Sequence, residues 1–246
     1  LFLGAFIIVG AWEWTALCHL KNLAARLLYV AVLVIAGVLF LTTPSWTLAL
    51  MGVAVLWWLW IFIEVLIYPD VHRGFLASRV GKLLSGFVVL LPAWIALPLL
   101  RDLSAHGAWL ALFLLLVVWA ADTGAYFAGH RWGKTKLAPR ISPGKTWEGV
   151  VGGLVLVLVL ALFAGLVVAD YRGAMLLAWV ALALITGFVS VLGDLFESRL
   201  KRAAGVKDSG TLFPGHGGVL DRIDAFTAAA PLFTFACLWW HAAGGR

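Results

Sequence analysis

The chain has 246 residues, of which 63% are hydrophobic and 12% are charged, and its net charge is +6. Because soluble domains carry about 25% charged residues, this composition excludes a soluble globular protein. It predicts an all-α, polytopic integral membrane protein. A bilayer span needs roughly 20 mainly apolar residues, which leaves no room for a large soluble domain. We therefore expect a single transmembrane domain over residues 1–246.

Eight apolar segments follow one another along the chain, and each is expected to form a transmembrane helix. They cover residues 1–17, 25–41, 46–67, 83–100, 107–129, 147–169, 173–200 and 220–240. The chain starts at Leu1 inside the first segment, without an initiator Met or a charged leader. We expect the N-terminus to be truncated, with one further helix ahead of Leu1.

The basic residues indicate how the helices are oriented. When the loops are taken alternately, one side of the membrane carries all of the 18 Lys and Arg residues except Arg101, Arg172 and Arg246. By the positive-inside rule this side is cytoplasmic. Topology thus accounts for the positive charge, and we expect no nucleic-acid partner. A basic residue outside the polar loops is most simply an anchor to anionic lipid headgroups.

The seventh segment carries a polar stripe on an otherwise apolar helix. The stripe consists of Thr186, Ser190, Asp194, Ser198 and Arg202, spaced four residues apart, with Glu197 and Lys201 beside it. A carboxylate near the bilayer centre costs about 2.5 to 3.5 kcal/mol, so Asp194 needs a partner. Asp194 and Ser198 offer two oxygens of the kind that Mg²⁺ prefers. The alternative is a structural Asp194 that is hydrogen-bonded to a neighbouring helix.

A second polar group spans the last loop and the start of the eighth segment. Asp221 and Asp224 share one face there, although acids at a helix start are also favoured by the helix dipole alone. The neighbouring polar residues and glycines are Lys207, Asp208, Gly215, His216, Gly217, Gly218 and Arg222. Glycines let backbone N–H groups approach a phosphate, and basic side chains add positive charge around it. Carboxylates for Mg²⁺ beside cations for phosphate are what phosphoryl or nucleotidyl transfer requires.

The loop before the sixth segment forms a third polar region. It predicts a tight turn at residues 143–144 and a helix N-cap at Thr146. Lys145 is expected at the membrane surface as a phosphate contact. Asp122, near the end of the fifth segment, and Glu148, in the first turn of the sixth, are equally compatible with a site and with a structural role.

Two acids and both cysteines lie alone in apolar segments. Glu13 and Glu64 are close to predicted interfaces, so hydrogen bonding to a neighbouring element is their expected role. Cys18 and Cys237 are far apart in the sequence, and each is in an apolar helix. This placement argues against a disulfide framework, and we expect both to be packing residues.

The polar run of residues 198–224, SRLKRAAGVKDSGTLFPGHGGVLDRID, resembles the signature of the phosphatidate cytidylyltransferase (CDP-diacylglycerol synthase) family. The run extends over 27 residues, carries more than a dozen fixed positions and shows no departure from the signature. The earlier pieces AWEW, residues 122–133 and SPGKTWEG also fit. The resemblance therefore covers most of the chain.

The resemblance implies a multi-pass inner-membrane enzyme whose active site faces the cytoplasm. It implies that CTP and phosphatidate, a membrane lipid, are joined to give CDP-diacylglycerol and pyrophosphate for phospholipid synthesis. It also implies a Mg²⁺ requirement, room for a second cation such as K⁺, a homodimer, and about nine helices in the full-length protein.

Joined to the polar groups above, the resemblance predicts a role for each candidate residue. The expected catalytic residues are Asp194, Asp221, Lys145 and Lys207. The expected metal ligands are Asp194, Ser198, Asp221, Asp224 and Glu197. The expected substrate-binding residues are Lys201, Arg202, His216, Gly217, Gly218, Arg222, Asp208, Ser142 and Asp122. Phosphatidate would attack the α-phosphorus of CTP in line, and no strong general base is needed because its phosphate is already ionised near neutral pH.

Two alternatives are open. A related CTP-dependent enzyme that acts on another lipid phosphate or on a polyprenol would need the same polar groups, because lipid tails are bound by apolar grooves that a sequence does not reveal. A cation-coupled transporter would also place carboxylates inside helices. The transporter predicts broken helices in matched halves of the chain, whereas no internal repeat is present here.

Overall fold

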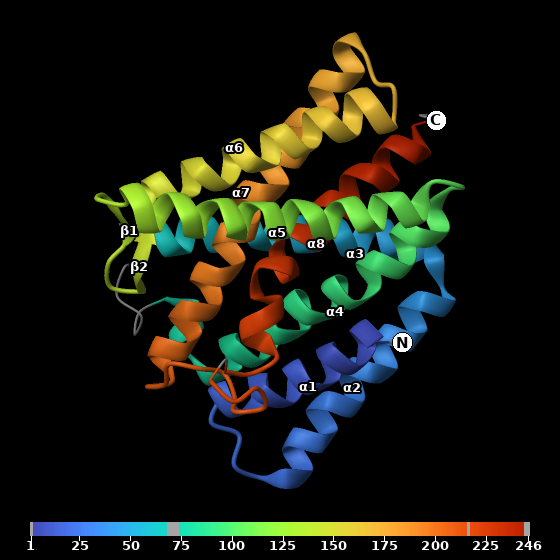
Figure 1. The fold of residues 1–246 in the computed structure, drawn as a ribbon. Helices are drawn as coiled ribbons and strands as arrows, with labels where there is room; N and C mark the ends of the chain where they lie inside the picture. Colours follow the sequence, from blue (N-terminus) through green and yellow to red (C-terminus); the bar gives the residue numbers. More distant parts are fainter. Residues whose placement is uncertain (1, 68–73, 216, 244–246) are drawn as a thin grey trace.

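The computed structural model describes residues 2–67, 74–215 and 217–243 (Figure 1). This part of the chain forms eight α-helices and one two-stranded sheet, in the order α1 (Phe2–Leu17), α2 (Leu23–Thr42), α3 (Thr47–Ile67), α4 (Arg79–Leu103), α5 (Gly107–Trp132), β1 (Lys136–Ala138), β2 (Ser142–Thr146), α6 (Trp147–Phe163), α7 (Gly173–Ala203) and α8 (Leu220–Ala242). A π-helical turn, η3 (Ala164–Val168), continues α6. Each predicted apolar segment is helical, so the predicted all-α membrane fold is confirmed.

Seven of the described helices, α2 to α8, are long and apolar enough to cross a membrane. Helix α1 has 16 residues, fewer than the roughly 20 that a span perpendicular to the bilayer needs. The predicted helix count is therefore confirmed, and the length criterion for spanning is met by all but the first helix.

Helix α8 lies inside the bundle, where it packs against α3, α4, α5 and α7 (Figure 1). In its apolar window 61% of the residues are buried, compared with 17% for the peripheral α2. Small residues make this packing possible: a Cβ atom at Gly193 of α7 would lie 2.4 Å from the carbonyl oxygen of Asp224 on α8. This close approach places Asp224 beside Asp194, the residue after Gly193.

Helices α5 and α6 also pack at backbone distance. A Cβ atom at Gly124 would lie 2.6 Å from the carbonyl oxygen of Gly152, and one at Gly153 would lie 2.5 Å from that of Ala121. Small residues at such an interface let two transmembrane helices approach closely. The two helices are joined at one end by the β1–β2 hairpin (Figure 1), which is thereby held at that end of the bundle.

The hairpin corrects one prediction. The turn predicted at residues 143–144 is wrong, because those residues belong to β2 and the chain reverses at residues 139–141. Ile141 donates its N–H to the carbonyl of Ala138 at 3.1 Å, which leaves Pro139 at the second position of the turn, where its fixed φ is favoured. The predicted N-cap is confirmed, since the Thr146 hydroxyl accepts the N–H of Gly149 at 3.1 Å.

Candidate active site

Asp194 is at the centre of a polar cluster that three elements build. One carboxylate oxygen of Asp194 lies 2.6 Å from Nζ of Lys145 on β2, and the other accepts the Ser198 hydroxyl at 3.3 Å. The side chains of Lys145 and Asp194 are 23% and 32% exposed, so the pair is accessible from outside. Asp122 of α5 lies within electrostatic range of both charges. The structure thus brings Asp194 close to Lys145 and Asp122, which the sequence analysis placed in a different polar region.

Two further acids lie next to this cluster. Asp224 of α8 is within electrostatic range of Asp194 and of Glu197, one turn along α7. The Glu197 side chain is only 4% exposed, and it interacts directly with the side chain of Asp224. Carboxylates that are held this close together repel each other, and a bound cation or protons would relieve that repulsion.

Asp221 organises a second group of contacts. One of its oxygens forms a hydrogen-bonded ion pair with Lys201, whose Nζ also lies 3.0 Å from Glu197. The other oxygen accepts the N–H and the hydroxyl of Ser209, both at 2.9 Å, and the N–H of Gly218 at 2.7 Å. Asp221 therefore fastens the loop between α7 and α8 to the end of α7.

Glycine is required beside Asp221. Gly217 has φ +82°, and a Cβ atom there would lie 2.4 Å from Asp221 Oδ2. The sequence predicted that Gly217 and Gly218 let backbone approach a phosphate. In the structure this close approach serves the Asp221 carboxylate, to which the Gly218 N–H already donates.

Glu13 of α1 caps the start of α8 from a distant part of the chain. Its carboxylate accepts the N–H groups of Val219 at 3.0 Å and Leu220 at 2.9 Å, and it lies 3.0 Å from the Ser209 hydroxyl, whose single proton it shares with Asp221. The first N–H groups of a helix lack partners inside the helix, and a negative charge is favoured there. The predicted hydrogen-bonding role of Glu13 is confirmed. Its partners lie about 200 residues away, and no local signal in the sequence points to them.

We expect Glu13→Gln to loosen the loop that Asp221 holds. The amide keeps one acceptor but loses the negative charge at the start of α8, at a cost of about 1–2 kcal/mol in the free energy of unfolding. Thermal unfolding in detergent and limited proteolysis of residues 204–219 measure the effect. Asp170→Asn, at an acid whose side chain is 83% exposed, is the matched control. Equal protease resistance in the two variants would contradict the capping role.

The structure gives the elements and the exposure of most of the remaining predicted substrate-binding residues. Arg202, Lys207 and Asp208 are exposed at the end of α7 and in the following loop, and Arg222 is exposed in the first turn of α8. Ser142 begins β2 and is half-buried. His216 lies outside the described residues. The roles of all these residues in substrate binding stay predictions.

Two other acids have structural roles. Glu64 of α3 forms a buried ion pair with Arg199 of α7, at 3.6 Å, in which both side chains are at most 3% exposed. Arg199 is thus a link between helices inside the protein. Glu148 accepts the N–H of Thr135 at 3.1 Å and its hydroxyl at 2.9 Å, which ties the start of α6 to the segment before β1.

The oxygen atoms around Asp194 are of the kind that bind a hard cation. Asp194, Ser198, Glu197 and Asp224 offer carboxylate and hydroxyl oxygens, the ligands that Mg²⁺ prefers. In the described part of the chain, however, no three His, Cys, Asp or Glu side chains form a ready metal-binding group. Asp221 is the least available of the five predicted ligands, since its oxygens already accept four donors. The ligand set therefore stays a prediction.

Comparison with known proteins shows which family the chain resembles along its length. The family described as "Cytidylyltransferase family" matches residues 1–240. A phosphatidate cytidylyltransferase of Pseudomonas aeruginosa is 46% identical over 246 residues, which cover 100% of this chain and 89% of the relative. Another, of Haemophilus influenzae, is 41% identical over 255 residues, covering 96% of this chain and 88% of the relative. With a family match over nearly its whole length, the chain belongs to the cytidylyltransferase family.

Proposed function

We propose that this protein transfers the cytidylyl group of CTP to phosphatidate, giving CDP-diacylglycerol and pyrophosphate. The observation that carries the proposal is the accessible Lys145–Asp194 pair, which places a phosphate-binding cation against a carboxylate cluster. The relatives at 46% and 41% identity are named for this activity. Family membership favours the enzyme over the transporter alternative.

The reaction is an in-line displacement at phosphorus. A phosphate oxygen of phosphatidate forms a bond to the α-phosphorus of CTP, and the bond from that phosphorus to the β-phosphate oxygen breaks, releasing pyrophosphate. Lys145 is placed to contact a phosphate through charge-assisted hydrogen bonds. The exposed cations Arg202 at the end of α7, Lys207 in the following loop and Arg222 in the first turn of α8 would hold the triphosphate. Mg²⁺ bound at Asp194 and Ser198 would neutralise charge on the α-phosphate and on the leaving group.

The enzyme would work at the cytoplasmic face of the inner membrane, as a homodimer. Orientation by the positive-inside rule puts the hairpin and the loop between α7 and α8 on the cytoplasmic side. This is the side from which CTP arrives, while phosphatidate remains in the leaflet. A second cation such as K⁺ belongs to the same proposal.

The direct test is an assay of the purified protein in nanodiscs with CTP, phosphatidate and Mg²⁺. Mass spectrometry of the lipids and a pyrophosphate assay should detect both products, and a chelator should abolish them. Product from polyprenol or from another lipid phosphate, with none from phosphatidate, would favour the related CTP-dependent enzyme. A well-folded protein that forms no CDP-lipid at all would refute the assignment.

Lys145→Ala should weaken the use of CTP. Removing one charge-assisted contact to a phosphate is expected to raise KM for CTP roughly tenfold. Lys136→Ala is the matched control, because Lys136 is an exposed lysine on the other strand of the same hairpin. Steady-state kinetics with varied CTP measure the difference. If both variants have the KM of the unmodified protein, Lys145 is an anchor to lipid headgroups.

A further inference from the structure

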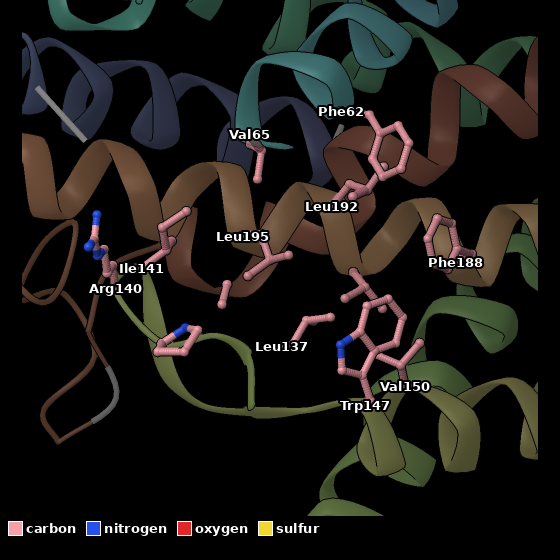
Figure 2. A pocket seen from close by; sticks show the side chains of 13 residues that line it. Phe62, Val65, Leu137, Arg140, Ile141, Trp147, Val150, Phe188, Leu192 and Leu195 are labelled. Carbon is pink, nitrogen blue, oxygen red and sulfur yellow. The ribbon is translucent and has the colours of Figure 1, made fainter. Parts of the chain in front are cut away.

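An apolar groove lies between the hairpin and the helices around it (Figure 2). Its volume is about 390 Å³, within the range of roughly 300–1,000 Å³ that is typical of ligand pockets. Its walls come from four parts of the chain, and include Phe62 of α3, Leu137 before the hairpin turn, Val150 of α6, and Val191 and Leu195 of α7. In Figure 2, Arg140 and Ile141 lie at one end of the groove, and Trp147 and Val150 lie toward the other.

The groove adjoins the candidate active site along α7 and at the hairpin. On α7, Leu195 lines the groove and directly follows Asp194, while Val191 lies one turn before Asp194. On the hairpin side, Trp147 lines the groove two residues after Lys145. Lys145 lies on β2, between the lining residue Ile141 and the lining residue Trp147, and its ion pair with Asp194 joins β2 to α7, which forms one wall of the groove.

The lining of the groove matches a lipid that has an anionic headgroup. The walls are almost entirely hydrocarbon and aromatic, which suits an acyl chain and does not suit a nucleotide. Arg140 adds one positive charge at one end, and it has no carboxylate partner among the residues that the structure describes. Trp147, 48% exposed at the first position of α6, suits a membrane–water interface.

We propose that this groove binds an acyl chain of the lipid substrate, with Arg140 contacting the anionic headgroup. A chain in the groove holds the lipid phosphate beside the Lys145–Asp194 pair, where the transfer takes place. The inference rests on the proposed function and adds to it the residues that select the lipid.

Photoaffinity labelling of the unmodified protein tests the groove without requiring turnover. Phosphatidate with a diazirine in the middle of one acyl chain is added to nanodiscs that contain the protein, and labelled peptides are mapped by mass spectrometry. We expect labels on residues 137–150 and 188–195, reduced by excess phosphatidate and much less by phosphatidylcholine. Labels confined to other helices, or equal competition by the two lipids, would overturn the proposal.

Two substitutions give a kinetic test. Val191→Trp fills the groove from α7 and should raise KM for dioleoyl phosphatidate roughly tenfold, with less effect on the dioctanoyl lipid and none on KM for CTP. Arg140→Ala, at an exposed position, should raise KM for both lipids roughly tenfold. Ile185→Trp on α7, where Ile185 is 52% exposed and outside the groove, is the matched control.

The outcomes separate this inference from the proposed function. If the unmodified protein forms CDP-lipid while Val191→Trp and Arg140→Ala both behave like Ile185→Trp, the groove proposal fails and the proposed function stands. If the unmodified protein forms no CDP-lipid, the proposed function fails, and the labelling result still decides whether the groove binds phosphatidate.

Discussion

Asp194→Asn is expected to abolish formation of CDP-diacylglycerol without unfolding the protein. The amide retains the shape of the carboxylate but removes the charge that Lys145 pairs with and that a cation would need. Loss of one electrostatic contributor to a phosphoryl-type transition state costs on the order of a hundred- to a thousandfold in rate. We expect a loss of this size at saturating CTP and phosphatidate.

The stability of the Asp194→Asn variant should rise or stay unchanged, although its activity is lost. Asp194 lies within electrostatic range of Asp122 and Asp224, so removing its charge relieves repulsion between carboxylates. Lys145, which is 23% exposed, can be solvated when its partner becomes neutral. Thermal unfolding in detergent, followed by tryptophan fluorescence, measures this. Lost activity at an unchanged or raised unfolding temperature is the expected combination, because functional charge clusters cost stability.

The control for Asp194→Asn is Asp102→Asn. Asp102 is paired with Arg101, its side chain is 70% exposed, and it lies in the last turn of α4, so its neutral variant should keep the normal rate. A rate for Asp194→Asn close to that of this control would remove Asp194 from the site. It would then be the structural, hydrogen-bonded acid that the sequence also allowed.

Asp221→Asn should lose both activity and stability. The three donors on Oδ2 and the Lys201 ammonium on Oδ1 leave no side of Asp221 that suits an amide NH₂ group. In either orientation, the amide NH₂ group of the Asp221→Asn variant would face hydrogen-bond donors, from Lys201 on one side or from Ser209 and Gly218 on the other. Since hydrogen bonds to charged groups contribute about 1.5–3 kcal/mol each, we expect the free energy of unfolding to fall by about 2–3 kcal/mol.

The loop between α7 and α8 is where this loss should appear first. Limited proteolysis should cut Asp221→Asn within residues 204–219 faster than the unmodified protein, and turnover should fall at least tenfold. Asp208→Asn, at an exposed acid of the same loop, is the control for stability. Full protease resistance together with lost activity would instead indicate a direct contact between Asp221 and the metal or substrate.

Most of the fold was predictable because the local hydrophobicity of the chain determines where the transmembrane helices form. Each apolar segment of bilayer length became a helix within a few residues of its expected bounds, since a backbone without water must satisfy its hydrogen bonds internally. The N-cap at Thr146 was predictable for the same reason, because its partner is three residues away. The turn position in the hairpin was not, because two Pro-containing stretches competed and strand pairing favoured the one at Pro139.

The sequence by itself determined that this is a helical membrane protein, which residues are available for chemistry, and the family resemblance. Only the tertiary structure decided how those residues are partnered. The approach of α7 and α8 at Gly193 brings Asp224 beside Asp194, and the hairpin brings in Lys145 from 49 positions away. Asp221, whose role as a metal ligand stays a prediction, fastens a loop in the structure, and Glu13 of α1 caps the helix that follows. The physical reason is that a carboxylate bonds to the donors that folding brings near it, and in a helical bundle most of those belong to other helices.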